Sequence, residues 1–406
     1  MRNYLIVTAS YWGFTLTDGA LRMLVLLHFY GLGYSPFTLA FLFLLYEAAG
    51  IVANLGGGWL AARFGIRRML SLGLSLQIVG LLFLSVLDPG WSAALSVVWV
   101  VAAQGIAGVA KDITKTASKS AIKITSVAGN TQLFRWVAWF TGSKNATKGF
   151  GFFLGGVLLD AAGFAPALWL MAALLAVILF SCVATLPSGL GATGASKSVR
   201  ELFGKSAGVN ILAAARIFMF GARDVWFVVG LPVFLYSAGW DFWEVGGFLA
   251  VWTIAYGAIQ ALAPSLVTRS ADGLSREVPA ARLWVIALTV IPALLIAALE
   301  AGAALPVSPA TVVVASLMLF GLPFAVNSSL HSYLILAYAG SKKAAEDVGF
   351  YYAANAAGRL MGTLLSGLLY QVGGLTACIL GSFLMLALCT AITFLLPRSA
   401  QREAVA

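Results

Sequence analysis

The segment FAPALWLMAALLAVILFSCVATLP, residues 164–187, contains no charged side chain in 24 consecutive positions. About 20 apolar residues in a row are enough for one helix to cross the hydrocarbon core of a bilayer. Comparable runs fill most of the 406-residue chain, which is 61% hydrophobic and only 10% charged and has a mean hydropathy of +0.95. Because soluble domains are about 25% charged, the composition excludes a water-soluble fold and predicts a polytopic membrane protein.

Twelve apolar runs, bounded by Gly, Pro and charged residues, predict an all-α protein with twelve transmembrane helices. The expected helices cover residues 4–30, 36–62, 69–87, 92–114, 133–160, 164–187, 208–236, 243–267, 281–301, 308–337, 347–371 and 374–396. The connections between them are too short for a soluble catalytic domain. The three cysteines fall inside these runs without metal-ligand spacing, and we expect neither a metal nor a cofactor.

The distribution of Lys and Arg predicts the orientation in the membrane. Loops on the side of the N-terminus carry basic residues, among them Arg67, Arg68, Lys342 and Lys343, whereas the opposite loops contain no Lys or Arg. By the positive-inside rule both termini are expected in the cytoplasm. Since the basic residues lie in short loops and within apolar runs, the net charge of +10 predicts contact with a lipid bilayer and no nucleic-acid partner.

The longest connection, GLGATGASKSVRELFGKS, is rich in Gly and Ser and is basic, which is typical of a flexible linker. It predicts an N-terminal six-helix bundle (1–188), a cytoplasmic linker (189–207), a C-terminal six-helix bundle (208–397) and a cytoplasmic tail (398–406). The two halves resemble each other, because three glycines recur at a constant offset of 211: Gly151, Gly156 and Gly163 correspond to Gly362, Gly367 and Gly374. Parallel repeats of this kind are typical of secondary transporters.

The loop after the second run has the sequence GWLAARFGIRR, residues 58–68. Together with the twelve spans, the duplicated half and the basic linker, it resembles the major facilitator superfamily, whose loop motif is G-x-L-a-D-r-x-G-r-r; here Ala62 replaces the usual Asp. The resemblance implies two pseudo-symmetric six-helix bundles and transport by alternating access. The segment GFFLGG, residues 151–156, is similar to the antiporter signature G-P-x-x-G-G, although close helix packing also explains its small residues.

Charged residues within the expected spans are candidates for a functional site, because a charge at the bilayer centre costs roughly 2.5–3.5 kcal/mol. The basic ones are Arg22, Lys111, Lys144, Lys148, Arg216, Arg223 and Arg359, and the acidic ones are Asp18, Glu47, Asp112 and Asp224. Seven cations face four carboxylates, so positive charge remains even if every carboxylate is paired. The excess predicts a central cavity that attracts anions.

Spacing along the chain indicates how these charges are arranged. Asp18 and Arg22 lie four residues apart on one helix face and can neutralise each other. Lys144 and Lys148 have the same spacing but repel, and no acid close in sequence neutralises them or Arg359. Arg223 is either a substrate ligand or part of an interhelical bridge with its neighbour Asp224. Beyond Lys111 the basic stripe continues with Lys115, Lys119 and Lys123, which we expect at a solvated helix end.

Several Arg and Lys side chains together suggest a small multivalent oxyanion, since Arg binds such groups with a planar fork and Lys with a point charge. We expect the seven cations to bind the substrate. Four polar residues, Asn145, Asn327, Tyr351 and Asn355, are expected to add hydrogen bonds to it. Asp18, Glu47 and Asp224 are candidates for proton coupling, and exchange against phosphate is an equally open mechanism.

Three segments of the first half are more specific: YWGFTLTDGALRM (11–23), KDITKTASKSAIK (111–123) and RWVAWFTGSKNATKG (135–149). Together they closely resemble the ArsJ permeases, organoarsenical efflux transporters of bacterial arsenic-resistance systems. The positions that match the family's motifs include Asp18, Arg22, Lys111, Lys144 and Lys148.

The resemblance implies a protein of the bacterial cytoplasmic (inner) membrane that exports 1-arseno-3-phosphoglycerate and confers arsenate resistance. It also implies a functional partner, glyceraldehyde-3-phosphate dehydrogenase, which incorporates arsenate to make this ester. The ester carries a phosphate and an arsenate group, in agreement with the surplus of cations. We expect the permease to act as a monomer.

Other functions fit parts of the pattern less well or equally well. An organophosphate:phosphate antiporter would need the same cations. A drug:proton antiporter is disfavoured, because many drugs are cationic and a positive cavity repels them. An intramembrane enzyme, such as a lipid-modifying transferase, is disfavoured because the chain has only two His and three Cys and no nucleophile–base pair.

Overall fold

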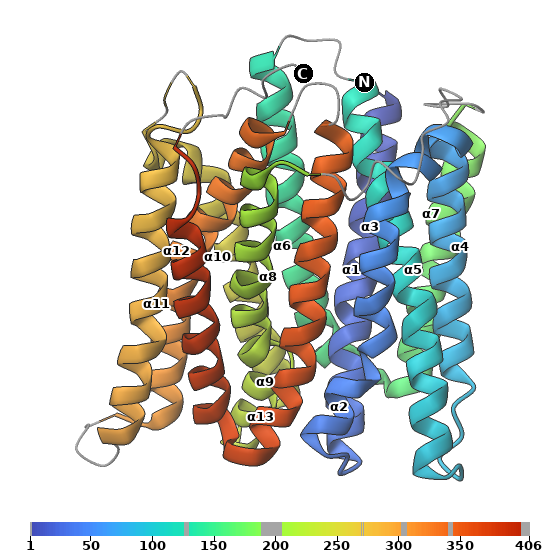
Figure 1. Cartoon of the computed structure of the whole chain (residues 1–406). Helices are drawn as coiled ribbons and strands as arrows, with labels where there is room; N and C mark the ends of the chain where they lie inside the picture. The colour runs from blue at the N-terminus through green and yellow to red at the C-terminus, as the bar shows by residue number, and fades with distance from the viewer. Residues whose placement is uncertain are drawn as a thin grey trace.

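The computed structural model describes residues 2–125, 130–187, 205–268, 270, 272–301, 307–339 and 344–398, which form helices joined by short connections and contain no strand. The long helices run side by side through one bundle, and the first and last described residues lie at the same end of it (Figure 1). We call this the terminal end. An all-α protein was predicted from the apolar runs, and this prediction is confirmed.

The helices follow the expected spans closely. They are α1 (Arg2–Gly31), α2 (Pro36–Leu42), α3 (Leu44–Phe64), α4 (Ile66–Ser85), α5 (Ala93–Thr125), α6 (Asn130–Ala162), α7 (Phe164–Thr185), α8 (Ala207–Phe227), α9 (Gly230–Ser237), α10 (Phe242–Leu266), α11 (Glu277–Ala301), α12 (Pro309–Tyr338) and α13 (Ala344–Phe394). The second span is divided into α2 and α3, and the seventh into α8 and α9. The last two spans form α13, which is broken at Gly373 and Gly374, where the backbone is not helical.

Nine helical segments of the described chain are long and apolar enough to cross a membrane, and the last of them, Asp347–Phe394, contains the final two spans. The two spans outside this group are α1 and α6, which carry several of the charged residues that the sequence analysis singled out, such as Arg22 and Lys148. Tertiary packing therefore has to accommodate the polarity of α1 and α6.

Local sequence explains where several helices begin and where the seventh span breaks. Ser206 and Ser308 accept hydrogen bonds from the backbone N–H groups of the first turns of α8 and α12, as N-cap residues do. Between α8 and α9 the hydroxyl of Ser366 instead accepts the N–H groups of Val229 and Gly230. This bond satisfies backbone donors that the interrupted helix leaves free.

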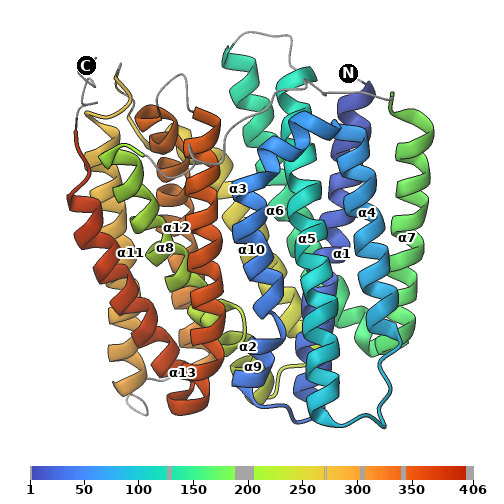
Figure 2. The same ribbon diagram turned by 45° about the vertical axis from the view of Figure 1, so that its right-hand side comes forward.

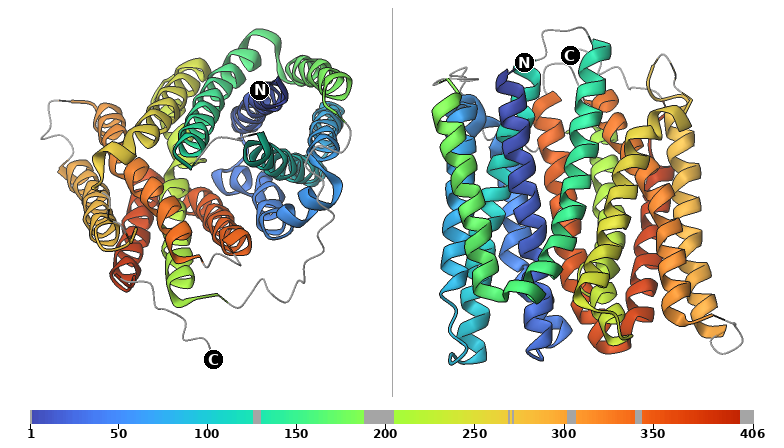
Figure 3. Two further views of the ribbon diagram at one scale, coloured as in Figure 1. Left: turned by 90° about the horizontal axis from the view of Figure 1, so that it is seen from above. Right: turned by 180° about the vertical axis from the view of Figure 1, so that it is seen from behind.

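Seen from the terminal end, the first part of the chain and the second part form two neighbouring groups of helices (Figure 3, left). In the first group α4 packs against α5 and α7, and in the second α8 and α11 pack against α13. Two contacts join the groups: α6 lies along α10, and α13 lies along α2 and α3 (Figure 2). Most of the expected linker (189–204) and the tail from residue 399 lie outside the described residues.

The recurring glycines lie at equivalent helix contacts. Gly151 of α6 packs against the backbone of α1 at Gly19, and its counterpart Gly362 of α13 packs against the backbone of α8 at Gly221. Gly163 and Gly374 both have positive φ angles, of 80° and 63°, where each begins the next span. Only glycine adopts this conformation readily, so the repeat in sequence corresponds to a repeat in structure.

A second glycine pair joins the two groups. Gly156 of α6 lies against the backbone of Phe242 at the start of α10, and Gly367 of α13 lies against that of Pro36 at the start of α2. Small residues at these crossings allow the helix backbones to approach closely. The GFFLGG segment therefore has a packing role in this structure.

A Gly362→Leu substitution is expected to lower stability, because a Cβ atom there would lie 2.6 Å from the carbonyl oxygen of Gly221. Overpacking of this kind costs about 1–3 kcal/mol. We expect the thermal unfolding midpoint of the detergent-solubilised protein to fall below that of a Gly56→Leu control, since a Cβ at Gly56 meets no atom within 4 Å. Equal midpoints in the two variants would contradict the close packing of α13 on α8.

Candidate functional site

A polar cavity lies between α1, α3, α5, α6 and α13 and contains about 560 Å³ of space free of protein atoms. It is lined by Tyr11, Phe14, Thr15, Asp18, Glu47, Gly50, Asn54, Lys111, Asp112, Lys115, Lys144, Lys148, Asn355, Ala356 and Arg359. Five of these side chains are basic and three are acidic. The lining therefore carries a positive excess, in a segment of the bundle that the bilayer surrounds.

The cavity extends from the middle of the bundle towards the terminal end. Along α1 its lining runs from Asp18 back to Tyr11, and along α13 it runs from Arg359 back to Asn355. Both helices begin at the terminal end (Figure 1). A substrate entering from the side of the termini would reach Asp18 and Arg359 last.

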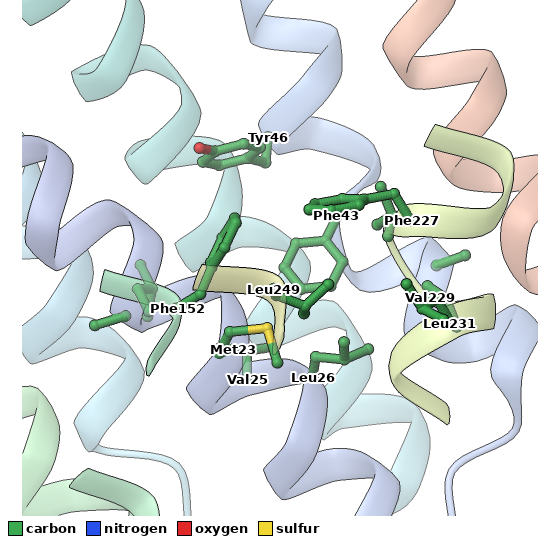
Figure 4. Packing of buried hydrophobic residues seen from close by; sticks show 14 of the residues in the cluster. Met23, Val25, Leu26, Phe43, Tyr46, Phe152, Phe227, Val229, Leu231 and Leu249 are labelled. Atoms are coloured by element: carbon green, nitrogen blue, oxygen red, sulfur yellow. The ribbon is translucent and has the colours of Figure 1, made fainter. Parts of the chain in front are cut away.

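Packed hydrophobic side chains lie beyond the cavity, away from the terminal end (Figure 4). The cluster includes Met23, Val25, Leu26, Phe43, Phe152, Phe227, Val229, Leu231 and Leu249, which come from both halves of the chain. The ring centroids of Phe152 in α6 and Phe227 in α8 are 6.1 Å apart. We call this cluster the hydrophobic plug. Its side chains are buried, and the contact of Phe152 with Phe227 joins the two halves on that side.

Glu47 is the most highly connected carboxylate of the site. It is 1% exposed, and its Oε1 accepts hydrogen bonds from Nη1 of Arg22 at 3.0 Å and from Nη2 of Arg359 at 2.7 Å. These ion pairs join α1, α3 and α13. A buried carboxylate can remain charged when two guanidinium groups face it.

Arg359 bridges acids from the two halves of the chain. Besides Glu47 it contacts Asp224 of α8, with 3.2 Å between Nε and Oδ2, and Asp224 is also paired with its neighbour Arg223. No acid close in sequence neutralises Arg359, as expected, but acids that are 312 and 135 positions away along the chain do. Likewise, the bridge from Asp224 to another helix runs to Arg359, while the Arg223 pair stays within α8.

Asp18 and Lys148 form a second pair across α1 and α6. Oδ2 of Asp18 lies 3.4 Å from the ammonium of Lys148, and Oδ1 accepts a 2.6 Å hydrogen bond from the hydroxyl of Tyr46. Asp18 is thus paired with Lys148, while Arg22, with which its spacing would allow a pair, is bound to Glu47. No acid close in sequence neutralises Lys148, as expected, and its partner is 130 positions away. Asp18 and Arg22 share one face of α1, but their partners come from other helices: Lys148 of α6 for Asp18 and Glu47 of α3 for Arg22.

Asp112 holds the two lysines at the entrance side of the cavity. It is paired with Lys111 at 3.6 Å and with Lys115, whose ammonium also donates to Asn54 at 2.9 Å. The ammonium of Lys111 lies 3.8 Å from the ring centroid of Tyr46, a cation–π contact. Lys115 was expected at a solvated helix end and instead lines the cavity, whereas the side chains of Lys119 and Lys123 lie outside the described part of the chain.

The structure brings half of the expected site residues to the cavity wall and places the others around it. Asp18, Glu47, Lys111, Lys144, Lys148, Asn355 and Arg359 line the cavity, whereas Arg22, Asn145, Arg216, Arg223, Asp224, Asn327 and Tyr351 do not. Arg22 and Asp224 form ion pairs with the lining residues Glu47 and Arg359, and Arg223 is paired with Asp224. Asn145 donates to Gln260 at 2.9 Å and so joins α6 to α10.

Sequence reasoning passed over Tyr46 and Asn54, both of which contact charged lining residues. A signal was present in each case. Asn54 is seven residues after Glu47, which places the two on one face of a helix. Tyr46 is next to Glu47 in an otherwise apolar segment, where a phenolic hydroxyl needs a partner.

Comparison with known proteins agrees with this architecture. The sequence model described as Major Facilitator Superfamily matches residues 4–307, while no curated protein matches the sequence. A crystal structure of a POT family transporter in complex with 5-aminolevulinic acid is similar with a TM-score of 0.75 and 13% identity, over 97% of this chain and 95% of that one. The nucleoside transporter NupG (15% identity) and a D-xylose-proton symporter (12%) both give TM-scores of 0.71, over 97% of this chain and 98% of theirs.

A Glu47→Gln substitution is expected to destabilise the protein, because it leaves Arg22 and Arg359 facing a neutral amide. Removing one partner of a buried ion pair costs about 3–5 kcal/mol. We expect a lower thermal unfolding midpoint than in the control Glu300→Gln, at an exposed position of α11. The double variant Glu47→Gln/Arg22→Gln should recover part of the loss, since one unpaired cation is removed as well. A midpoint for Glu47→Gln equal to that of the control would contradict the bridging role of Glu47.

Proposed function

Because the chain belongs to the major facilitator superfamily, a family of secondary transporters, we propose that it is an exporter of an anionic organoarsenical ester. The proposed substrate is 1-arseno-3-phosphoglycerate, as the resemblance of the first half to the ArsJ permeases implies. The observation that carries the proposal is the cavity, whose lining has five basic and three acidic side chains. Such a field attracts a multivalent anion and repels cationic drugs.

The orientation belongs to the same proposal. With both termini in the cytoplasm of a bacterium, the cavity extends towards the cytoplasm, and the hydrophobic plug separates it from the outside. The substrate then enters where a cytoplasmic glyceraldehyde-3-phosphate dehydrogenase would release it. Export follows when the two halves of the chain rock, closing the terminal end and parting the plug. The unit of transport is a single chain.

The ion pairs suggest how binding and movement are coupled. Lys148 and Arg359 are held by Asp18, Glu47 and Asp224, so an arriving oxyanion competes with these carboxylates for the same cations. A carboxylate that loses its cation in a buried site is easier to protonate. Substrate binding would therefore loosen the Arg359 bridge between the halves and promote proton uptake by Asp18, Glu47 or Asp224. A phosphate ion entering from outside could take the substrate's place on the same cations.

An organophosphate:phosphate antiporter is the second candidate, because the cavity charge favours any multivalent phosphate ester equally. The two functions differ in their need for arsenate. An enzyme activity finds no support in the family, whose structurally similar members are transporters.

Transport in everted membrane vesicles tests the proposal. Vesicles containing the protein are supplied outside with radiolabelled arsenate, glyceraldehyde-3-phosphate, the dehydrogenase and its nicotinamide cofactor. We expect arsenic to accumulate inside only when every component is present, since arsenate alone is not the proposed substrate. Uptake of glycerol-3-phosphate against internal phosphate, without dehydrogenase-dependent arsenic uptake, would establish the antiporter instead. If neither assay shows uptake, both the organoarsenical exporter and the organophosphate:phosphate antiporter are overturned.

Lys148→Ala and Lys144→Ala are each expected to reduce this transport by about 10- to 100-fold, the value of a lost charged hydrogen bond. Both side chains line the cavity, and transport is compared per amount of folded protein, because Lys148→Ala also removes the partner of Asp18. Arg68→Ala is the matched control, because Arg68 is exposed and outside the cavity. Transport at the wild-type rate in both lysine variants would remove these residues from the substrate site.

A further inference from the structure

Arg216 differs from the other intramembrane arginines that the structure describes. It is 4% exposed, and it donates hydrogen bonds to neutral oxygens: Nε donates to Oδ1 of Asn355 and Nη1 to the carbonyl of Ser328, both at 3.2 Å. Unlike Arg22, Arg223 and Arg359, it forms no ion pair with a carboxylate of the described chain. A permanently charged guanidinium is thus buried without a counterion in the part of the chain that the structure describes.

Buried polar groups without hydrogen-bond partners among the described residues lie on α12 and α13, the two helices that accept hydrogen bonds from this arginine. Its guanidinium carbon lies 5.0 Å from the ring centroid of Tyr351, whose hydroxyl has no hydrogen-bond partner among the described residues. The same is true of both ring nitrogens of His331 and both amide atoms of Asn327. Asn327 and His331 are four residues apart on α12 and flank Ser328, and all three side chains are 0% exposed.

Buried polar groups are almost always satisfied in native proteins, because leaving them unpaired is costly. Three such side chains, on helices that contact a cation without a counterion among the described residues, are therefore not explained by the stability of the fold alone. An oxyanion satisfies the hydrogen-bond donors among them. It pairs with the guanidinium and accepts from the tyrosine hydroxyl, the asparagine amide and an imidazole N–H.

The arginine is adjacent to the cavity through Asn355, which lines the cavity and also binds Arg216. Arg359 follows four residues later on α13, about 6 Å along the helix axis. Arg216 belongs to α8 in the second half of the chain, whereas the lysines at positions 111, 144 and 148 reach the cavity from the first half. Arg216 does not itself line the cavity, and the side chain of Asn355 lies between it and the cavity.

We propose that Arg216, Asn327, His331 and Tyr351 form a second anion-binding subsite. It receives one end of the substrate when the side chain of Asn355 releases Arg216 and moves aside, while the lysines of the first half hold the other end. The inference rests on the proposed function and narrows its substrate class to short carbon chains with an oxyanion at both ends. A ligand of this kind contacts both halves of the chain at once. Its binding therefore favours a conformation in which the two halves are closer together around the ligand.

The test uses three stable probes that differ in the number of acidic groups and in the length of the carbon chain between them. Propane-1,3-diyl bisphosphate carries two phosphates on a three-carbon chain, methylenediphosphonate carries two acidic groups on one carbon, and propyl phosphate carries one. Binding to the purified protein in lipid nanodiscs is measured by calorimetry. We expect the three-carbon bisphosphate to bind about tenfold or more tightly than either other probe, since only it reaches both Arg216 and the lysines of the first half.

Arg216→Gln is expected to weaken binding of the three-carbon bisphosphate by about 10- to 100-fold and to leave propyl phosphate binding unchanged. The affinity of Arg216→Lys for the three-carbon bisphosphate should lie between those of the wild type and Arg216→Gln, because lysine keeps the charge and lacks the planar guanidinium. Arg276→Gln, at an exposed position outside the membrane, is the matched control and should bind all probes as the wild type does. If Arg216→Gln does not fold, the order of the three probes by affinity for the wild-type protein still tests the proposal.

Different negative results would overturn either the second subsite or the proposed function. Equal wild-type affinity for the one-carbon and three-carbon probes, or equal weakening of all probes by Arg216→Gln, would overturn the second subsite and leave an anion transporter. Binding of none of the three probes to the wild type, together with absent vesicle transport, would overturn the proposed function itself.

Discussion

The structure depends on one electrostatic constraint: charged side chains in the membrane region must find partners inside the protein. Glu47 shows this most clearly, since two arginines from two other helices converge on a single carboxylate oxygen. This convergence sets the positions of α1, α3 and α13 relative to one another. Arg359 extends it to Asp224, so that a chain of ion pairs crosses from the first half to the second. Glycine contacts then allow the helix backbones to approach closely enough for these pairs to form.

The cavity contains the charge that remains after this pairing. Three acids among five bases leave its lining positive, although nearly every group has a partner in this conformation. An anion therefore binds by competing for cations that are already held, which links its arrival to changes in the pairs between helices. A cavity of free cations would bind anions tightly without such a link. The two ends of the cavity differ: the polar lining extends towards the terminal end, and the hydrophobic plug lies on the opposite side.

The fold could be predicted in detail because membrane helices follow from local composition. Each apolar run such as 164–187 is long enough to span the bilayer wherever it lies in the protein, and α7 coincides with that run to within two residues. The candidate site was predicted less completely. The charged residues were identified, but the pairs Asp18–Lys148 and Glu47–Arg359 join positions 130 and 312 residues apart, while the expected local pair Asp18–Arg22 is replaced. Sequence spacing shows which side chains share a helix face, and it does not show which helix that face meets.

The sequence by itself thus determined that the chain enters a membrane, how many times it crosses, that its halves are related and that cations outnumber acids within it. Each of these properties is set by residue type and spacing along one helix. Only the tertiary structure decided which acid neutralises which base, that Lys115 reaches the cavity, and that Arg216 has no counterion among the described residues. The physical reason is that partners for a buried charge are chosen by distance in space, and twelve packed helices bring together residues from the whole length of the chain.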